Sequence, residues 1–138
     1  MAAPLGVRLA VEVIPNELSS ASNLVTLIED DLDLLDIGVC LDYGHAFLMG
    51  DLVDAIETVS GHLVTTHVHD NEGKTDAHLV PFDGGIDWAA AMIATQKVGY
   101  DGTLLLELAN LENPRSVLEK ARRARTRFER MLAIPEEP

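Results

Sequence analysis

Four short apolar runs in this sequence each end in a residue that can bind a metal ion. The runs span residues 8–12, 37–42, 63–67 and 103–107, and they end in Glu12, Asp42, His67 and Glu107. Three carboxylates and one imidazole form a mixed oxygen and nitrogen donor set that suits a divalent cation such as Mn²⁺, Co²⁺, Mg²⁺ or Zn²⁺. Together, the four residues predict a metal site.

Each of these residues also has a simpler explanation when it is taken alone. Glu12 can be a charge at a strand end, Asp42 the cap of a turn, and His67 a core histidine bound to a backbone carbonyl. Glu107 follows three leucines, so we expect it to be buried, where a carboxylate is costly without a cation. A shared site explains all four better, because unrelated residues would not fall at the same end of four elements.

The surrounding segments predict the elements that position these side chains. We expect buried strands near 7–13, 37–42, 62–68 and 103–108, because the runs there are short and apolar. Helical spacing of apolar residues follows each strand, and the last helix is expected near 114–132. Strand–helix alternation is typical of a parallel sheet, whose strands end at a common edge. The four candidate ligands should therefore converge.

Residues that favour helix N-caps precede the helical segments, and they are Ser19, Ser20, Ser22, Asp51 and Asp87. The first helix should carry the apolar residues of segment 24–35, and residues 43–45 are expected to form a loop. The connection at 69–86 is long for a compact domain, and such connections are usually functional. Among its polar residues are His69, Asp70, Asn71, Asp76 and His78.

Four βα units in 138 residues predict an α/β fold that is half of a (β/α)₈ TIM barrel, since the closed barrel takes about 250 residues. We expect one partial-barrel domain over 1–138.

The net charge of −13 argues against nucleic acid as a partner. No apolar run approaches the roughly 20 residues that span a membrane, so a cytoplasmic protein without a membrane partner is expected. Cys40, the single cysteine, is expected to be a small buried residue.

The order of the motifs resembles the C-terminal half of the xylose-isomerase-like barrels. This superfamily includes sugar-phosphate isomerases and epimerases, hydroxypyruvate isomerases, inosose dehydratases and endonucleases of the apurinic endonuclease IV type. The resemblance rests on Leu-Ala-Val-Glu12, Leu41-Asp-Tyr-Gly-His45, His67-Val-His-Asp-Asn71, Asp76-Ala-His78-Leu-Val-Pro81, Gly85-Ile-Asp-Trp88 and Leu-Leu-Glu107.

The resemblance implies roles for individual residues. Positions Glu12, Asp42, His67 and Glu107 match the ligands of the shared divalent-metal site, and in the epimerase branch the two glutamates also transfer the substrate proton. His45 and His69 match histidines that contact substrate oxygens. In the endonuclease-like branch, the counterparts of His45, Asp76 and His78 hold a further zinc ion, so a second metal is an alternative.

The sequence departs from the family pattern in two ways. Phe82 stands where the family commonly has a glycine, which predicts another path for the loop, and Asp83 can replace a glutamate with a shorter reach. The first four βα units are also absent, which leaves two open sheet edges. The chain is then expected to form a homodimer, to join a separate N-terminal half-barrel, or to be an inactive fragment.

These observations leave three functions open. The leading hypothesis is a metal-dependent isomerase or epimerase of a small sugar or sugar phosphate. The alternatives are a metal-dependent phosphodiesterase of the abasic-site endonuclease type, which Asp76 and His78 favour, and a non-catalytic metal-binding half-barrel.

Overall fold

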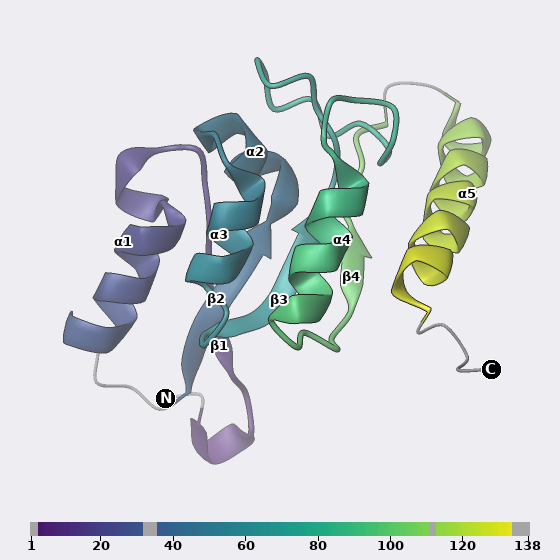
Figure 1. Cartoon of the computed structure of the whole chain (residues 1–138). Coiled ribbons are helices and arrows are strands. Elements are labelled where there is room, and N and C mark those ends of the chain that lie inside the picture. The colour runs from purple at the N-terminus through teal and green to yellow at the C-terminus, as the bar shows by residue number, and fades with distance from the viewer. Residues whose placement is uncertain (1–2, 32–35, 111–112, 134–138) are drawn as a thin grey trace.

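The chain folds around a four-stranded parallel sheet with strand order β1-β2-β3-β4 (Figure 1). In this computed structural model, the described residues are 3–31, 36–110 and 113–133. The strands are β1 (Leu9–Glu12), β2 (Ile37–Asp42), β3 (Leu63–Val68) and β4 (Leu104–Leu106). In the parallel register, Glu12 lies opposite Cys40, and His67 lies between Asp42 and Leu105. The predicted α/β class with a parallel sheet is confirmed.

Five α-helices and three short helical turns connect and flank these strands in the described part of the chain. The α-helices are α1 (Ala21–Thr26), α2 (Tyr43–Met49), α3 (Leu52–Thr58), α4 (Trp88–Lys97) and α5 (Pro114–Leu132). The turns are the 3₁₀ turns η1 (Ala3–Leu5) and η2 (Glu17–Ser19) and the π-helical turn η3 (Leu27–Asp31). The remaining long connection is the β3–α4 loop, residues 69–87.

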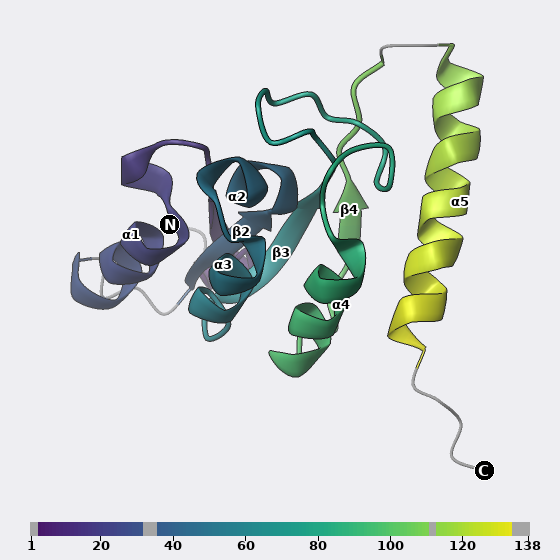
Figure 2. The ribbon, with the colours of Figure 1, turned by 45° about the horizontal axis from the view of Figure 1, so that its top comes forward.

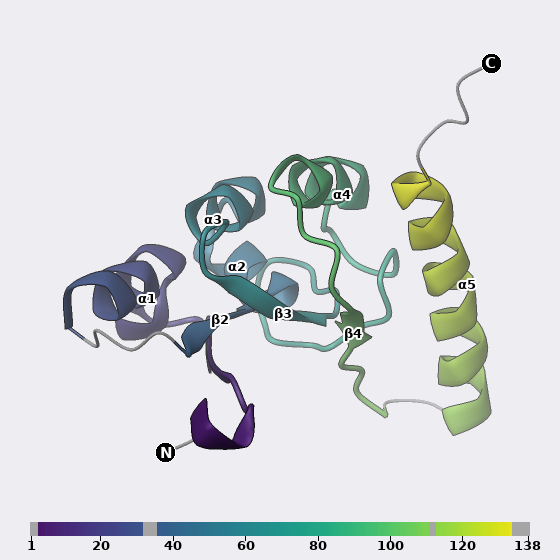
Figure 3. The same ribbon diagram turned by 90° about the horizontal axis from the view of Figure 1, so that it is seen from below.

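The helices lie on one side of the curved sheet. Viewed from below, α1, α3 and α4 follow one face in sequence, and no described α-helix covers the opposite face, although the short turn η1 lies on that side near the N-terminus (Figure 3). Helix α5 stands beyond β4 at the end of the sheet (Figure 2). This is the arrangement of half a (β/α)₈ barrel, in which the helices surround the strands and the uncovered face lines the barrel interior.

The core lies between the sheet and the helices because alternate strand residues point toward them. Val39 and Leu41 of β2 and Val68 of β3 are fully buried, and they belong to one apolar cluster with Ile56 of α3 and Met92 of α4. The opposite set of strand residues includes Asp42 and His67. Packing of the outer face therefore fixes the direction in which the candidate ligands point.

Capping side chains set where the helices begin. The caps are Ser20, Asp42, Asp51, Asp87 and Asn113, and each accepts a hydrogen bond from a backbone N–H of the first helical turn. The expectation of a loop at 43–45 is wrong, because Asp42 caps α2 directly: its Oδ1 accepts the N–H of His45 at 2.8 Å. The first expected helix appears as α1 and η3, while its residues Leu32 and Leu35 lie outside the described residues.

Candidate metal centre

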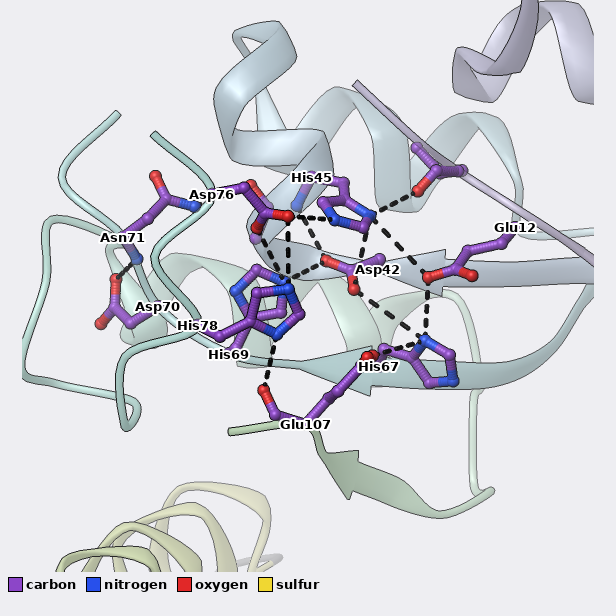
Figure 4. A network of polar contacts seen from close by, with 12 residues as sticks. Glu12, Asp42, His45, His67, His69, Asp70, Asn71, Asp76, His78 and Glu107 are labelled. Carbon is purple, nitrogen blue, oxygen red and sulfur yellow. Dashed lines mark hydrogen bonds and ion pairs between the residues drawn. The ribbon is translucent and has the colours of Figure 1, made fainter. Parts of the chain in front are cut away.

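The carboxylates of Glu12 and Glu107 both contact one nitrogen of His67. Nδ1 of His67 lies 2.9 Å from Glu12 Oε1, 2.9 Å from Glu107 Oε2 and 3.9 Å from Asp42 Oδ2. One ligand atom from each of the four residues lies within 4.8 Å of those of the other three (Figure 4). The structure therefore brings together the four residues that end the apolar runs, which we call the first group.

The first group has the chemistry that a divalent cation requires. Asp42 is completely buried, and its Oδ2 has no hydrogen-bond partner among the described residues. A buried carboxylate oxygen without a donor is costly, and a cation would remove that cost. Three carboxylates and one imidazole also match the ligands that Mn²⁺, Co²⁺, Mg²⁺ and Zn²⁺ accept.

Glu107 does not match the expectation of a buried carboxylate. Its side chain is 47% exposed, because β4 ends at Leu106 and no described strand lies on its outer side. The cost of burial therefore supports a cation at Asp42 and not at Glu107. The argument for Glu107 rests on its 2.9 Å contact with His67.

A second group of four residues lies beside the first. Its members are His45, His69, Asp76 and His78, whose ligand atoms also lie within 4.8 Å of one another. Asp76 Oδ2 lies 3.1 Å from His45 Nε2 and 3.3 Å from His78 Nε2. Three imidazoles and one carboxylate are a donor set typical of zinc. The four residues that the resemblance assigned to substrate or a second metal thus form one cluster.

Backbone oxygens orient two of the three imidazoles of the second group. His45 Nδ1 lies 3.0 Å from the carbonyl oxygen of Val13, and His78 Nδ1 lies 3.0 Å from that of Glu107. Each bond requires a proton on Nδ1, so Nε2, which contacts Asp76 in both rings, is the nitrogen that could bind a cation. His78 has a φ of 45°, a conformation that is uncommon for a residue other than glycine and that recurs at functional sites.

His69 is completely buried, and neither ring nitrogen has a hydrogen-bond partner among the described residues. Its Nε2 lies 2.9 Å from Asp42 Oδ1, but the pair is not aligned as a hydrogen bond. The ring stacks on His78 with centroids 3.8 Å apart. On its other side it lies against Gly44, where a Cβ would collide with the imidazole. Glycine at position 44 therefore creates the space that His69 occupies.

Asp42 links the two groups, and its spacing in the sequence gives no sign of this. Its carboxylate lies near His67 of the first group, and it lies 3.5 Å from His45 Nδ1 and 2.9 Å from His69 Nε2 of the second. Glu12 Oε1 is also 3.8 Å from His45 Nδ1. The two groups are thus one continuous polar centre with two candidate cation positions.

The electrostatics of the centre favour a charged His45–Asp76 pair when no cation is bound. Burial of the His45 ring lowers its pKa, but the charge of Asp42 and the hydrogen bond to Asp76 outweigh burial and raise this pKa above its usual value. Burial raises the pKa of Asp76, yet its hydrogen bond to His45 and the nearby histidines lower it overall. The raised pKa of His45 means that a cation at this ring competes with a proton.

Cys40 lies beside the first group without the properties of a ligand. Burial, followed by the charges of Glu12, Asp42 and Glu107, raises the pKa of its thiol to about 12. A thiol must lose its proton to bind a metal or act as a nucleophile. Cys40 therefore stays a small buried side chain, as the sequence predicts.

His62 and Asp83 lie outside both groups of candidate ligands. His62 pairs with Glu29 at 2.9 Å, before the start of β3. Asp83 pairs with Lys120 of α5 at 3.2 Å, so its carboxylate faces that helix. Among the described residues, no helix has the length and apolar character needed to cross a membrane.

The fold and this centre define a class of protein, half of a parallel βα barrel with residues that could hold a metal ion at the carboxyl ends of its strands. Residues 1–130 match the model of the xylose isomerase-like TIM barrel family, and the chain belongs to this family. An uncharacterized protein of Sinorhizobium fredii, y4fM, is 33% identical over 142 residues, which cover 92% of this chain and 42% of that protein. The chain thus spans less than half the length of this relative.

Solved structures show the same fold. A D-tagatose 3-epimerase-like protein superposes with a TM-score of 0.80 and 24% identity, covering 95% of this chain and 50% of that chain. The IOLI protein with a bound zinc atom gives a TM-score of 0.75 and 21% identity, covering 96% of this chain and 53% of that one. The predicted half-barrel is therefore confirmed by the length of each match.

Proposed function

We propose that this chain carries the metal centre of a divalent-metal-dependent isomerase or epimerase that acts on a small sugar or sugar phosphate. The observation that carries the proposal is the convergence of Glu12, Asp42, His67 and Glu107 within 4.8 Å at the carboxyl ends of the strands. Active sites of βα barrels lie at that face. A structural neighbour that is a D-tagatose 3-epimerase-like protein supports the substrate class.

The environments of the four residues suit them to different roles, either in cation binding or in proton transfer. Asp42 and His67, with the two glutamates, would hold a divalent cation, which when bound makes the C–H beside a carbonyl more acidic. Glu12 and Glu107 keep partly exposed side chains, at 31% and 47%, so they can reach a substrate. One glutamate takes the proton from carbon while the C–H electron pair moves toward the carbonyl, and the other returns a proton from the opposite face.

The test measures deuterium uptake from ²H₂O into a panel of ketoses and ketose phosphates with Mn²⁺ or Co²⁺ present. We expect exchange at the carbon beside the carbonyl, and we expect Glu12→Gln and Glu107→Gln to lower its rate about 100-fold or more. Glu57→Gln, on the exposed side of α3, is the matched control. No exchange in any sugar at full metal occupancy would contradict the proposal and favour a non-catalytic half-barrel.

A second candidate is a metal-dependent phosphodiesterase of the abasic-site endonuclease type. The cluster of His45, His69, Asp76 and His78 favours it, because adjacent cations are suited to phosphodiester hydrolysis. The net charge of −13 opposes it, because the field repels DNA. Cleavage of a duplex with an abasic site in the presence of Zn²⁺ would make it the leading function.

Another half-barrel would complete the active site. Leu9 of β1 and Leu105 of β4 are each 50% exposed, and the outer edges of both strands pair with no other described strand. Open apolar edges favour pairing, so we propose that a second copy of this chain or an N-terminal half-barrel closes the structure.

We also propose a cytoplasmic location for the protein, which fractionation of cells tests.

A further inference from the structure

The β3–α4 loop carries Asp76 and His78, and it is closed at its base by the residue that follows His69. The backbone of Asp70 exchanges two hydrogen bonds with Leu79, each 2.8 Å long. Next to it, the carbonyl of Asn71 accepts the N–H of Gly85 at 2.8 Å. The loop thus leaves β3 and returns to the same two residues, with both candidate ligands in between (Figure 4).

The Asp70 carboxylate is completely buried, and each of its oxygens accepts two hydrogen bonds. Oδ1 accepts the N–H groups of Asn71 and Ile86, at 2.9 and 3.2 Å. Oδ2 accepts the N–H of Phe82 at 2.9 Å and the indole N–H of Trp88 at 2.8 Å. A carboxylate offers about four acceptor positions, so this one has none left for a cation.

We infer that Asp70 is the positioning residue of the second group: its carboxylate binds both ends of the β3–α4 loop and thereby places Asp76 and His78 against His45 and His69. It acts through these ligands and touches no cation itself. All four donors come from the loop or from the first residue of α4, so the carboxylate joins the two ends of the loop to the start of that helix. The expected effect on metal binding rests on the proposed second metal site, whereas the expected effect on hydrogen exchange of the loop does not.

A glycine in the same loop supports this inference. A Cβ at Gly84 would collide with Asp70 Oδ1 and lie 2.6 Å from the carbonyl oxygen of Asn71, whereas a Cβ at Gly85 would meet nothing closer than 3.6 Å. The loop therefore passes as close to the carboxylate as a backbone without a side chain permits. Alanine at these two positions gives a matched pair, since one change displaces the carboxylate and the other does not.

The experiment titrates the full chain with Co²⁺ and follows the visible absorption bands of the bound ion, together with amide hydrogen exchange of residues 72–86. Asp70→Asn places an N–H₂ group against two N–H donors. We expect Asp70→Asn and Gly84→Ala to weaken the second Co²⁺ site about 10-fold or more, to change its spectrum, and to speed exchange in the loop by a similar factor. Binding at the first group should be unchanged.

The controls are Asp87→Asn and Gly85→Ala. Asp87 caps α4 at the end of the same loop, and asparagine caps a helix equally well. The inference would be overturned if Asp70→Asn changed neither hydrogen exchange of the loop nor Co²⁺ affinity at the second group. Equal effects in the two controls would also overturn it. So would loss of the whole fold in both test variants, which circular dichroism detects. If the unmodified chain binds a single Co²⁺, the proposed second metal fails, and the loop exchange alone decides the role of Asp70.

Discussion

At the scale of the residue, Asp42 has two separable tasks. Its Oδ1 caps α2, and its Oδ2 is a buried acceptor that lies within 4 Å of two histidines. Asparagine keeps the cap but loses the charge, so Asp42→Asn should leave α2 in place and weaken Mn²⁺ or Co²⁺ binding by more than about 10-fold. Isothermal titration calorimetry measures this loss.

Asp51→Asn is the control, because Asp51 caps α3 in the same way without facing the centre. At a cation concentration of 100 times Kd, binding should stabilise the unmodified chain and Asp51→Asn by about 2.7 kcal/mol. At the same cation concentration, a 10-fold weaker site would stabilise Asp42→Asn by only about 1.4 kcal/mol, so its gain should be no more than that. Equal stabilisation of all three chains in urea unfolding would remove Asp42 from the metal site.

At the scale of the element, α5 holds the β3–α4 loop through an unusual residue. Phe82 has a φ of 79°, which is the left-handed conformation that glycine favours. The loop therefore does not need another path to accommodate phenylalanine at this position. Its ring contacts Trp88 and Phe128, at centroid distances of 6.0 and 5.1 Å, and Arg127 lies 3.4 Å above it. Aromatic packing offsets the backbone strain.

Substitution by glycine and by alanine separates these two effects. Both Phe82→Gly and Phe82→Ala lose the ring contacts, so each should lower the free energy of unfolding by about 1–3 kcal/mol. Glycine also relieves the strain, and Phe82→Gly should be more stable than Phe82→Ala by about 1 kcal/mol. Urea unfolding compares the two, and an alanine variant as stable as the glycine variant would show that the conformation is not strained.

At the scale of the whole molecule, the uncovered face of the sheet should drive association. Leu105 lies on β4 and is half exposed. Leu105→Lys places a charge where another half-barrel would pack, so it should weaken self-association about 10-fold or more, as measured by sedimentation equilibrium. Leu118→Lys, at an exposed position of α5, is the control. A chain that stays monomeric at all concentrations would exclude the homodimer and leave the separate N-terminal half-barrel.

The sequence by itself determined the strand-forming runs, the helix caps at Asp51 and Asp87, and the identity of the four residues at the strand ends. These features are local or periodic, and the apolar spacing that produces them can be counted along the chain. Topology rules then placed the ends of parallel strands at one edge. For this reason the sequence alone is enough to group Glu12, Asp42, His67 and Glu107.

Tertiary structure alone decided how these residues meet the rest of the molecule. The exposure of Glu107, the burial of His69 against Gly44, and the four donors around Asp70 all depend on how the chain packs in space. Hydrogen-bond partners and desolvation depend on which groups are neighbours in space, whereas the spacing of residues in the sequence describes only their order along the chain. Sequence thus identified the candidate ligands, and packing determined that Asp42 connects two groups and that a buried aspartate closes the loop beside them.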